Sequence, residues 1–417
     1  MKIAFVFGIL ALGALSGLPS CKKSTATPDK TQTITLPSGG ASVITANNQV
    51  AFNFLHATLQ QDPADNNKLI SPLSLYLALS MVYNGADNDT KDSIARALAI
   101  SGMDINTLNA TCQALIAQLP TEDNKVQLSI ANSIWYKQST YQPLAPFLNI
   151  ARTDYAATVQ PLNFDDPGSV NTINNWVAQK TNNKIPTILN NISSDELMFL
   201  IDAIYFNGAW QYGFKTSNTF TDSFHLHNGI AKAVPFMIQQ IKLNAYGDSS
   251  FRMIELPYGG GKSYSMYIAI PNNPQQSIGA FAALMDQAKL SATISKMDSM
   301  YMVLEIPKWE YSYAVDDMQP ELAQLGMGIA FTNAADFSNI YDPTQVKVKI
   351  SRAIHKTYIK VNETGTQAAA VTAIGIIPQD VPAIFPIKFD HPFLYTIVER
   401  QTGAILFAGI LNDPSAE

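Results

Sequence analysis

Charged residues and cysteines are scarce in this sequence. Charged residues make up 14% of the 417 residues, the formal net charge is -6, and two cysteines are present. Proteins that bind nucleic acids neutralise phosphates with clustered Lys and Arg, and no such cluster occurs here. A helix expected over residues 106–119 has no basic residue with which to bind a heparin-like polyanion. The sequence therefore predicts no nucleic-acid or polyanion partner, and we expect a monomer.

Motifs of common enzyme sites are also missing. The five histidines belong to no nucleophile elbow, zinc-protease helix or Cys-His pair. His225 and His227 would share one face of a strand, where they either hold a metal or lie in a solvent-facing hairpin, and we favour the hairpin. The glycines at 259–261 lack phosphate-loop spacing and are expected to form a turn. The sequence therefore predicts no catalytic residues, no metal and no cofactor.

Residues 1–20 have the features of a lipoprotein signal peptide. Lys2 precedes an apolar run over residues 3–15, and the following Leu-Pro-Ser-Cys resembles a bacterial lipobox that ends at Cys21. Cys21 would then be lipidated and would anchor the chain in a membrane of the cell envelope. Because Lys22 rather than aspartate follows, we expect the outer membrane or cell surface. An ordinary cleaved signal with an incidental cysteine is the alternative.

The rest of the chain divides into a tether and one large domain. Residues 21–46 contain few large apolar side chains and are expected to form a flexible tether, and residues 47–417 the domain. No later apolar run is long enough to span a membrane. Once Cys21 is acylated, Cys112 is the only thiol left, so no intramolecular disulfide is expected.

Apolar periodicity predicts an α+β domain in which helices come first and strands dominate later. Helices are predicted over residues 50–59, 71–82, 89–98, 105–119 and 170–180. Strands are predicted over residues 126–136, 196–206, 263–271, 300–309, 350–362 and 390–398.

The last two predicted strands are separated by about thirty residues without helix signals. This segment begins E-T-G-T-Q-A-A-A-V-T at residues 363–372, where small side chains dominate. A structureless connection of this length is uncommon in a compact domain and is usually functional. We therefore expect an exposed functional loop whose composition would allow it to become a β-strand.

Seven segments, taken together and in order, carry a family resemblance that extends from about residue 50 to residue 414. They are N-K-L-I-S-P-L-S-L-Y-L-A-L (67–79), I-D-A-I-Y-F-N-G-A-W (201–210), I-E-L-P-Y (254–258), L-E-I-P-K-W (304–309), A-D-F-S-N-I (335–340), H-K-T-Y-I-K-V-N-E-T-G-T-Q-A-A-A (355–370) and D-H-P-F-L-Y (390–395). They resemble the signatures of serpins. The resemblance implies a fold with three β-sheets, eight or nine helices and an exposed reactive-centre loop.

The resemblance also implies a function as a suicide substrate. A serine or cysteine endopeptidase would attack the loop and form an acyl-enzyme, and the cut loop would then insert into the main sheet. Strand alternation turns Thr366 and every second residue after it inward, where small side chains fit without overpacking. The implied hinge comprises Glu363, Gly365, Thr366, Gln367, Ala368, Ala369, Ala370, Val371 and Thr372. A non-inhibitory serpin that acts as a chaperone or carrier is the alternative.

The cleavage site is placed by the family's usual interval. Counting seventeen residues from Glu363 gives Gln379 and Asp380 as the scissile pair, with Ile376 and Ile377 as alternatives. The segment from Thr366 to Gln379 would span about 46 Å as a strand. Residues 364–387 contain no Lys or Arg, so we expect elastase-like, subtilisin-like or papain-like rather than trypsin-like targets.

Two further clusters are implied by the resemblance. The shutter, beneath the centre of the main sheet, would consist of Asn67, Ser71, Ser74, Asp202 and His355. The breach, where the loop enters, would consist of Trp210, Lys308 and Glu363, and a buried tryptophan with a surface ion pair is the alternative interpretation. Asp202 replaces the family's asparagine. If Asp202 meets His355, loop insertion should depend on pH between about 5 and 8.

Overall fold

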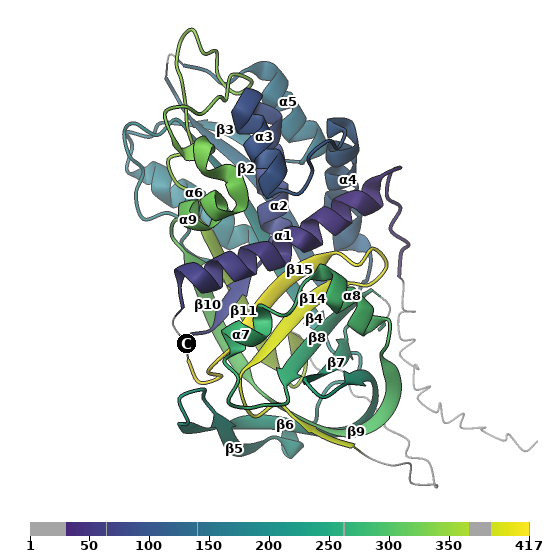
Figure 1. Cartoon of the computed structure of the whole chain (residues 1–417). Helices are drawn as coiled ribbons and strands as arrows, with labels where there is room; N and C mark the ends of the chain where they lie inside the picture. The colour runs from purple at the N-terminus through teal and green to yellow at the C-terminus, as the bar shows by residue number, and fades with distance from the viewer. Residues whose placement is uncertain (1–30, 64, 140, 262, 367–384, 417) are drawn as a thin grey trace, which may run out of the picture.

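The computed structural model describes residues 31–416, except for 64, 140, 262 and 367–384. Within this part of the chain there are nine α-helices and two hydrogen-bonded sheets (Figure 1). The helices are α1 Gly40–Gln61, α2 Pro72–Gly85, α3 Asn88–Ala97, α4 Ile105–Gln118, α5 Ala145–Asp154, α6 Gly168–Lys180, α7 Ile278–Ala282, α8 Gln287–Ile294 and α9 Gln319–Leu322.

The larger sheet has nine strands. Its order is β1-β15-β14-β8-β7-β6-β9-β13, with β5 paired to β6. The bounds are β1 Lys68–Ile70, β5 Phe220–His225, β6 Ala231–Gly247, β7 Phe251–Pro257, β8 Tyr264–Pro271, β9 Asp298–Pro307, β13 Phe385–Lys388, β14 Phe393–Glu399 and β15 Ile405–Leu411. Because the long β6 pairs with β9 and, at its end, with β7, the expected second and third sheets are joined into one.

The smaller sheet has six strands in the order β10-β11-β12-β4-β2-β3. Their bounds are β2 Val126–Lys137, β3 Thr158–Leu162, β4 Met198–Ala209, β10 Trp309–Val315, β11 His355–Asn362 and β12 Gly365–Thr366. Alternation along β4 sends Phe199, Ile201 and Ala203 into a cluster beneath α6, and Ile204 and Phe206 into the main core. The sheet is therefore covered on both faces, as its apolar sequence predicts.

Two of the predicted element boundaries are wrong. Helix α1 begins at Gly40 rather than residue 50, because Val43, Ile44 and Ala46 pack into the core. The backbone N–H of Gln32 donates to Glu122 O at 2.8 Å, so the expected tether over 21–46 contains residues that lie on the domain. The strand expected over 350–362 starts only at His355, because backbone groups of residues 350 and 353 bond to residues 330 and 318 instead.

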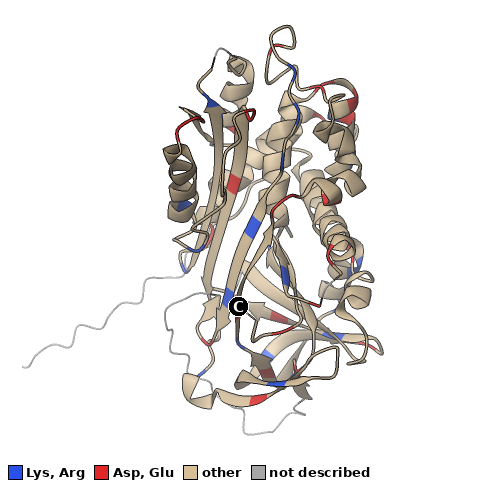
Figure 2. Cartoon of the chain, turned by 90° about the vertical axis from the view of Figure 1, so that its left-hand side faces the viewer, with Lys and Arg blue, Asp and Glu red and all other residues tan. Residues whose placement is uncertain are grey.

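The turns predicted from glycine and histidine are present. His225 ends β5 and His227 lies in the turn before β6, so the pair belongs to a hairpin and does not share a strand face. The glycines at 259–261 connect β7 and β8. In Figure 2 the positions of Lys and Arg (blue) and of Asp and Glu (red) are interspersed along the ribbon. Among the helices that the structure describes, none is long and apolar enough to cross a bilayer.

Candidate functional site

The six-stranded sheet is incomplete between β4 and β11. We call the end of the sheet that contains Gly208 and Val361 its top. There the short β12 lies between the two strands, with Thr366 opposite Val361 on one side and Gly208 on the other. Below β12 the two long strands pair only with their outer neighbours, β2 and β10, over their described residues. Their facing edges therefore carry backbone donors and acceptors that one more strand could satisfy.

Gly365 allows β12 to enter this gap. Its φ of 147° lies in a region that residues with a side chain rarely adopt. A Cβ at this position would lie 2.1 Å from Gly208 O and 2.8 Å from the Cα of Ala209, which is too close for any substitution without movement of the backbone. The glycine of the predicted hinge is thus required by the close approach of β4.

Thr366 is held at the head of the gap by an aromatic pair. The threonine is 3% exposed, and its Oγ1 shares a hydrogen bond of 2.5 Å with the hydroxyl of Tyr258. Tyr258 stacks on Trp210 with ring centroids 4.5 Å apart, and the Trp210 Nε1 donates to Asn362 O at 3.0 Å. Tyr258 was missed as a site residue, although it ends the I-E-L-P-Y segment that carried the resemblance.

Glu363 anchors the start of the hinge. Its carboxylate accepts hydrogen bonds from Thr219 Oγ1 at 2.7 Å and from Lys308 Nζ at 3.2 Å. Burial alone would raise the pKa of Glu363, but these hydrogen bonds outweigh it and hold the pKa below its ordinary value. Because Glu363 is buried, the pair with Lys308 is not simply a surface ion pair. The predicted breach residues therefore lie together around the entry point.

Four of the five predicted shutter residues lie deeper between the sheet and α2. The Ser71 N–H donates to His355 Nε2 at 3.0 Å, and the Ser71 hydroxyl donates to Leu406 O at 2.9 Å. The Ser74 hydroxyl donates to Asp202 Oδ1. These contacts join α2 to β4, β11 and β15 beneath the point where an inserted strand would pass.

Asn67 is not part of this cluster. Its amide oxygen accepts from the N–H groups of Asn412 and Asp413, at 2.8 and 2.9 Å, and its amide nitrogen donates to Asp413 O at 2.7 Å. Because β1 pairs with β15, the side chain that precedes β1 reaches the residues that follow β15. Asn67 thus fixes the C-terminal segment.

The other predicted site residues lie outside the described residues. They are the hinge residues Gln367, Ala368, Ala369, Ala370, Val371 and Thr372, the scissile candidates Ile376, Ile377, Gln379 and Asp380, and the lipidation residue Cys21.

Comparison with known proteins identifies the architecture. Residues 45–414 match the family model described as Serpin (serine protease inhibitor). The chain belongs to the serpin family. It is 32% identical over 382 residues to an uncharacterized serpin-like protein of Methanosarcina acetivorans, with 90% of this chain and 87% of the relative covered. It is also 32% identical to the leukocyte elastase inhibitor of Bos taurus, with 88% and 98% covered.

Solved serpin structures share the fold. The native thermophilic serpin Tengpin superposes with a TM-score of 0.82 at 30% identity, covering 92% of this chain and 97% of its own. Thyroxine-binding globulin in complex with thyroxine gives a TM-score of 0.80 at 26% identity, covering 90% and 100%. The predicted serpin fold is thereby confirmed.

Burial favours the uncharged form of both titratable groups in the shutter. Burial raises the pKa of Asp202 to about 8, although the Ser74 hydroxyl opposes the shift. Burial lowers the pKa of His355 to about 4, and its Nε2 accepts a hydrogen bond in the neutral form. The two side chains share no hydrogen bond or ion pair among the described contacts. The Asp202–His355 contact, on which the expected pH-dependent insertion was conditional, is therefore not made among the described contacts, and the pKa of Asp202 lies closer to neutral pH than that of His355.

We expect Asp202→Asn to flatten the pH dependence of stability. The native pKa of Asp202 is raised above that of the unfolded chain, so its stabilisation is complete at low pH and is lost as pH rises towards about 8. The loss cannot exceed about 1.4 kcal/mol per pH unit. Unfolding rates measured in denaturant at pH 5, 6, 7 and 8 should increase with pH more steeply in the parent protein than in the variant. Parallel profiles would contradict a buried, protonated Asp202.

We expect Gly365→Ala to expel β12 from the sheet. The Trp210 amide donates to Thr364 O at 2.9 Å and reports on this pairing. Its hydrogen exchange should become at least about tenfold faster, which corresponds to a decrease of about 1.4 kcal/mol in the free energy of local opening. Gly229→Ala is the matched control, because Gly229 has a φ of 83° but no atom within 4 Å of an added Cβ. Unchanged protection in Gly365→Ala would show that the hinge does not need glycine.

Proposed function

We propose that this serpin inhibits endopeptidases by inserting its cleaved reactive loop between β4 and β11. The observation that carries the proposal is the position of β12, whose two residues already pair with both strands at the top of a gap that no other described strand fills. An inserted segment would extend the hydrogen-bonded pairing of β12 further along β4 and β11. This is the arrangement that a suicide-substrate mechanism requires, and it supports inhibition over a purely structural role.

The covalent chemistry belongs to the target enzyme. Its nucleophile attacks the scissile carbonyl of the loop, the amine of the following residue leaves, and an acyl-enzyme ester or thioester remains. Cleavage separates the N-terminal part of the loop from β13, while Glu363 and Gly365 keep the start of the loop at the breach. Insertion then draws the attached enzyme along the sheet, and inhibition succeeds if insertion precedes deacylation.

The dimensions of the gap favour small inward side chains. Directly below Thr366, the space between the strands is only about 10 Å³ and is lined by residues that include Ile204, Phe206 and Ile359. Alternation from Thr366 turns Ala368 and Ala370 to the same face. Because this space is smaller than one residue, β4 and β11 must separate as the loop enters, and alanine side chains keep the added volume small.

The loop sequence supports elastase-like, subtilisin-like or papain-like targets. No basic residue occurs between 364 and 387, so the carboxylate of a trypsin-like specificity pocket would stay unpaired. The similarity to the bovine leukocyte elastase inhibitor supports an elastase-like target. We place the scissile bond between Gln379 and Asp380, with Ile376 or Ile377 as the alternative positions.

A carrier function is the second candidate. Thyroxine-binding globulin, which shares the fold, was solved with thyroxine bound. The two functions differ in what cleavage does, because a carrier needs no rapid insertion. The glycine at 365 and the small residues that follow it favour the inhibitor.

We also propose that the protein acts outside the cytoplasm, anchored through a lipid on Cys21. The support is the signal-like sequence of residues 1–20 and the lipobox-like residues before Cys21. Radiolabelled palmitate should enter the parent protein in cells and should not enter Cys21→Ser. Label retained in Cys21→Ser would contradict anchoring at this residue.

The inhibitory mechanism is tested by a protease panel. Elastase or subtilisin should form a denaturant-resistant complex whose mass equals the sum of the two chains minus the released fragment, whereas trypsin should not. In Thr366→Arg, a guanidinium would replace a 3%-exposed hydroxyl beside Tyr258, so insertion should slow. The number of inhibitor molecules consumed per trapped enzyme is one plus the ratio of the deacylation rate to the insertion rate, and that ratio should rise at least about tenfold, which corresponds to about 1.4 kcal/mol in the insertion barrier.

Thr366→Ser keeps the hydroxyl and should stay close to the parent. If no protease in the panel forms a complex, or if Thr366→Arg traps enzyme as efficiently as the parent, loop insertion is not the mechanism. Mass mapping of the released fragment identifies the scissile bond.

A further inference from the structure

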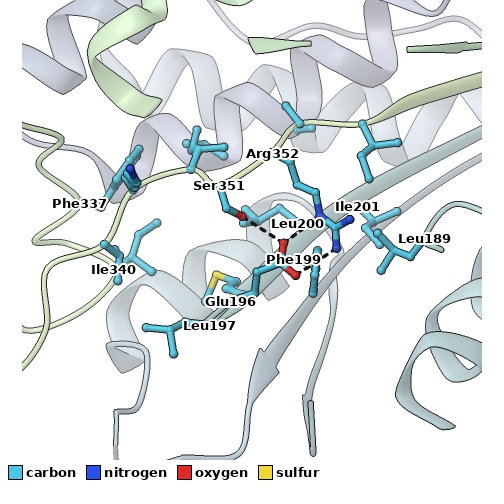
Figure 3. A pocket seen from close by; sticks show the side chains of 18 of the residues that line it. Leu189, Glu196, Leu197, Phe199, Leu200, Ile201, Phe337, Ile340, Ser351 and Arg352 are labelled. Atoms are coloured by element: carbon cyan, nitrogen blue, oxygen red, sulfur yellow. Dashed lines mark hydrogen bonds and ion pairs between the residues drawn. The ribbon is translucent and has the colours of Figure 1, made fainter. Parts of the chain in front are cut away.

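A cavity of about 640 Å³ lies next to the shutter residues Ser74, Asp202 and His355, at the end of the gap away from β12. Figure 3 shows side chains that line it. One wall is β4 with the residues that lead into it, including Leu197, Leu200 and Ile201. The opposite side is formed by the segment 346–354, and α2 contributes Leu75 and Leu79. Most of the lining side chains are apolar. The volume and lining are typical of sites for small organic ligands.

The charges around this cavity are opposite in sign to that of the whole protein. Five basic residues line it, namely Lys137, Lys347, Lys349, Arg352 and Lys356, against three acidic residues, Asp195, Glu196 and Asp202. Asp202 stays protonated at neutral pH because it is buried. The lining is therefore net positive, although the chain has a net charge of -6.

The basic residues differ in what they already bind. Arg352 pairs with Glu196 at 2.8 Å, an interaction drawn in Figure 3, and Lys137 donates to Ser194 O at 2.8 Å. Lys347 and Lys349 are exposed and form no ion pair with any carboxylate that the structure describes. These two lysines are therefore available to bind an anionic group at the opening of the cavity.

The lining of the cavity indicates which small ligand it suits. Most of its side chains are apolar, and the exposed Lys347 and Lys349 are among its lining residues. An apolar interior with two lysines at its opening suits a molecule with a long hydrocarbon tail and a single anionic head.

We propose that this cavity binds a fatty acid. The hydrocarbon tail lies among the apolar side chains of β4 and α2, and the carboxylate pairs with Lys347 and Lys349. Because the lower half of an inserted loop would pass through the same space, a bound fatty acid slows insertion. This last consequence rests on the proposed inhibitory function, whereas binding itself does not.

Titration calorimetry of the purified full chain tests the site directly. Octanoate, decanoate and laurate, each below its micelle-forming concentration, should bind with an affinity that rises about fourfold per methylene, since each buried methylene contributes about 0.8 kcal/mol. 1-Dodecanol should bind at least about tenfold more weakly than laurate. Affinity that does not depend on chain length, or equal binding of alcohol and acid, would overturn the proposal.

Two variants separate the contributions of charge and cavity. Reversing both opening lysines, Lys347→Glu with Lys349→Glu, should weaken laurate at least about tenfold, whereas the same reversal at the exposed Lys215 and Lys296, which do not line the cavity, should have no effect. Ala78→Phe, which fills the cavity from α2, should abolish the dependence on chain length. Thermal melting identifies any variant that fails to fold, and an unaltered affinity in both folded variants would contradict the site.

The two proposals fail in different ways. If the chain forms no protease complex but laurate binds as described, the fatty-acid site remains and the inhibitory function is wrong. If protease complexes form normally but laurate neither binds nor slows their formation, inhibition remains and the fatty-acid site is wrong.

Discussion

The fold depends on a pair of facing strand edges that do not pair with each other. β4 bonds to β2 and β11 bonds to β10, and of the described residues only the two of β12 lie between them. An unsatisfied buried backbone group costs about 1–3 kcal/mol, so a strand that fills the gap would gain far more than one hydrogen bond ordinarily contributes. The chain carries a candidate strand next to the gap, in the segment that follows Thr366.

Different residues start insertion and oppose it. At the breach, Gly365 permits close approach to β4, and Tyr258 holds Thr366 in register. Below it, the Ser71 and Ser74 contacts join α2 to the strands that must separate. Arg352 and Glu196 connect the two sides of the gap at its lower end. Insertion therefore begins at Thr366, which already pairs with β4 and β11, and must break and remake polar contacts as it proceeds. This is consistent with a native state that persists because its conversion is slow.

Sequence motifs predicted five of the nine described helices (α1–α4 and α6), six of the fifteen described strands (β2, β4, β8, β9, β11 and β14) and the breach, because these depend on local periodicity and on residues such as Trp210 and Glu363 in recognisable segments. They failed where a long-range partner decides the outcome. The start of β11 is set by hydrogen bonds to residues 318 and 330, and Asn67 is directed to residues 412–413 by the pairing of β1 with β15. Asp202 and His355 are both in the shutter, but their partners are different serines. The fatty-acid cavity combines segments far apart in sequence and left no motif.

The central claim is that the gap accepts the loop, and denaturant-free thermal unfolding of intact and loop-cleaved protein tests it most directly. A protease that cuts once within residues 364–387 and is then removed supplies the cleaved form. The account predicts that cleavage raises the melting temperature by more than about 10 °C, because the freed segment completes the sheet. Equal melting temperatures for the two forms would show that the facing edges of β4 and β11 do not take up the loop.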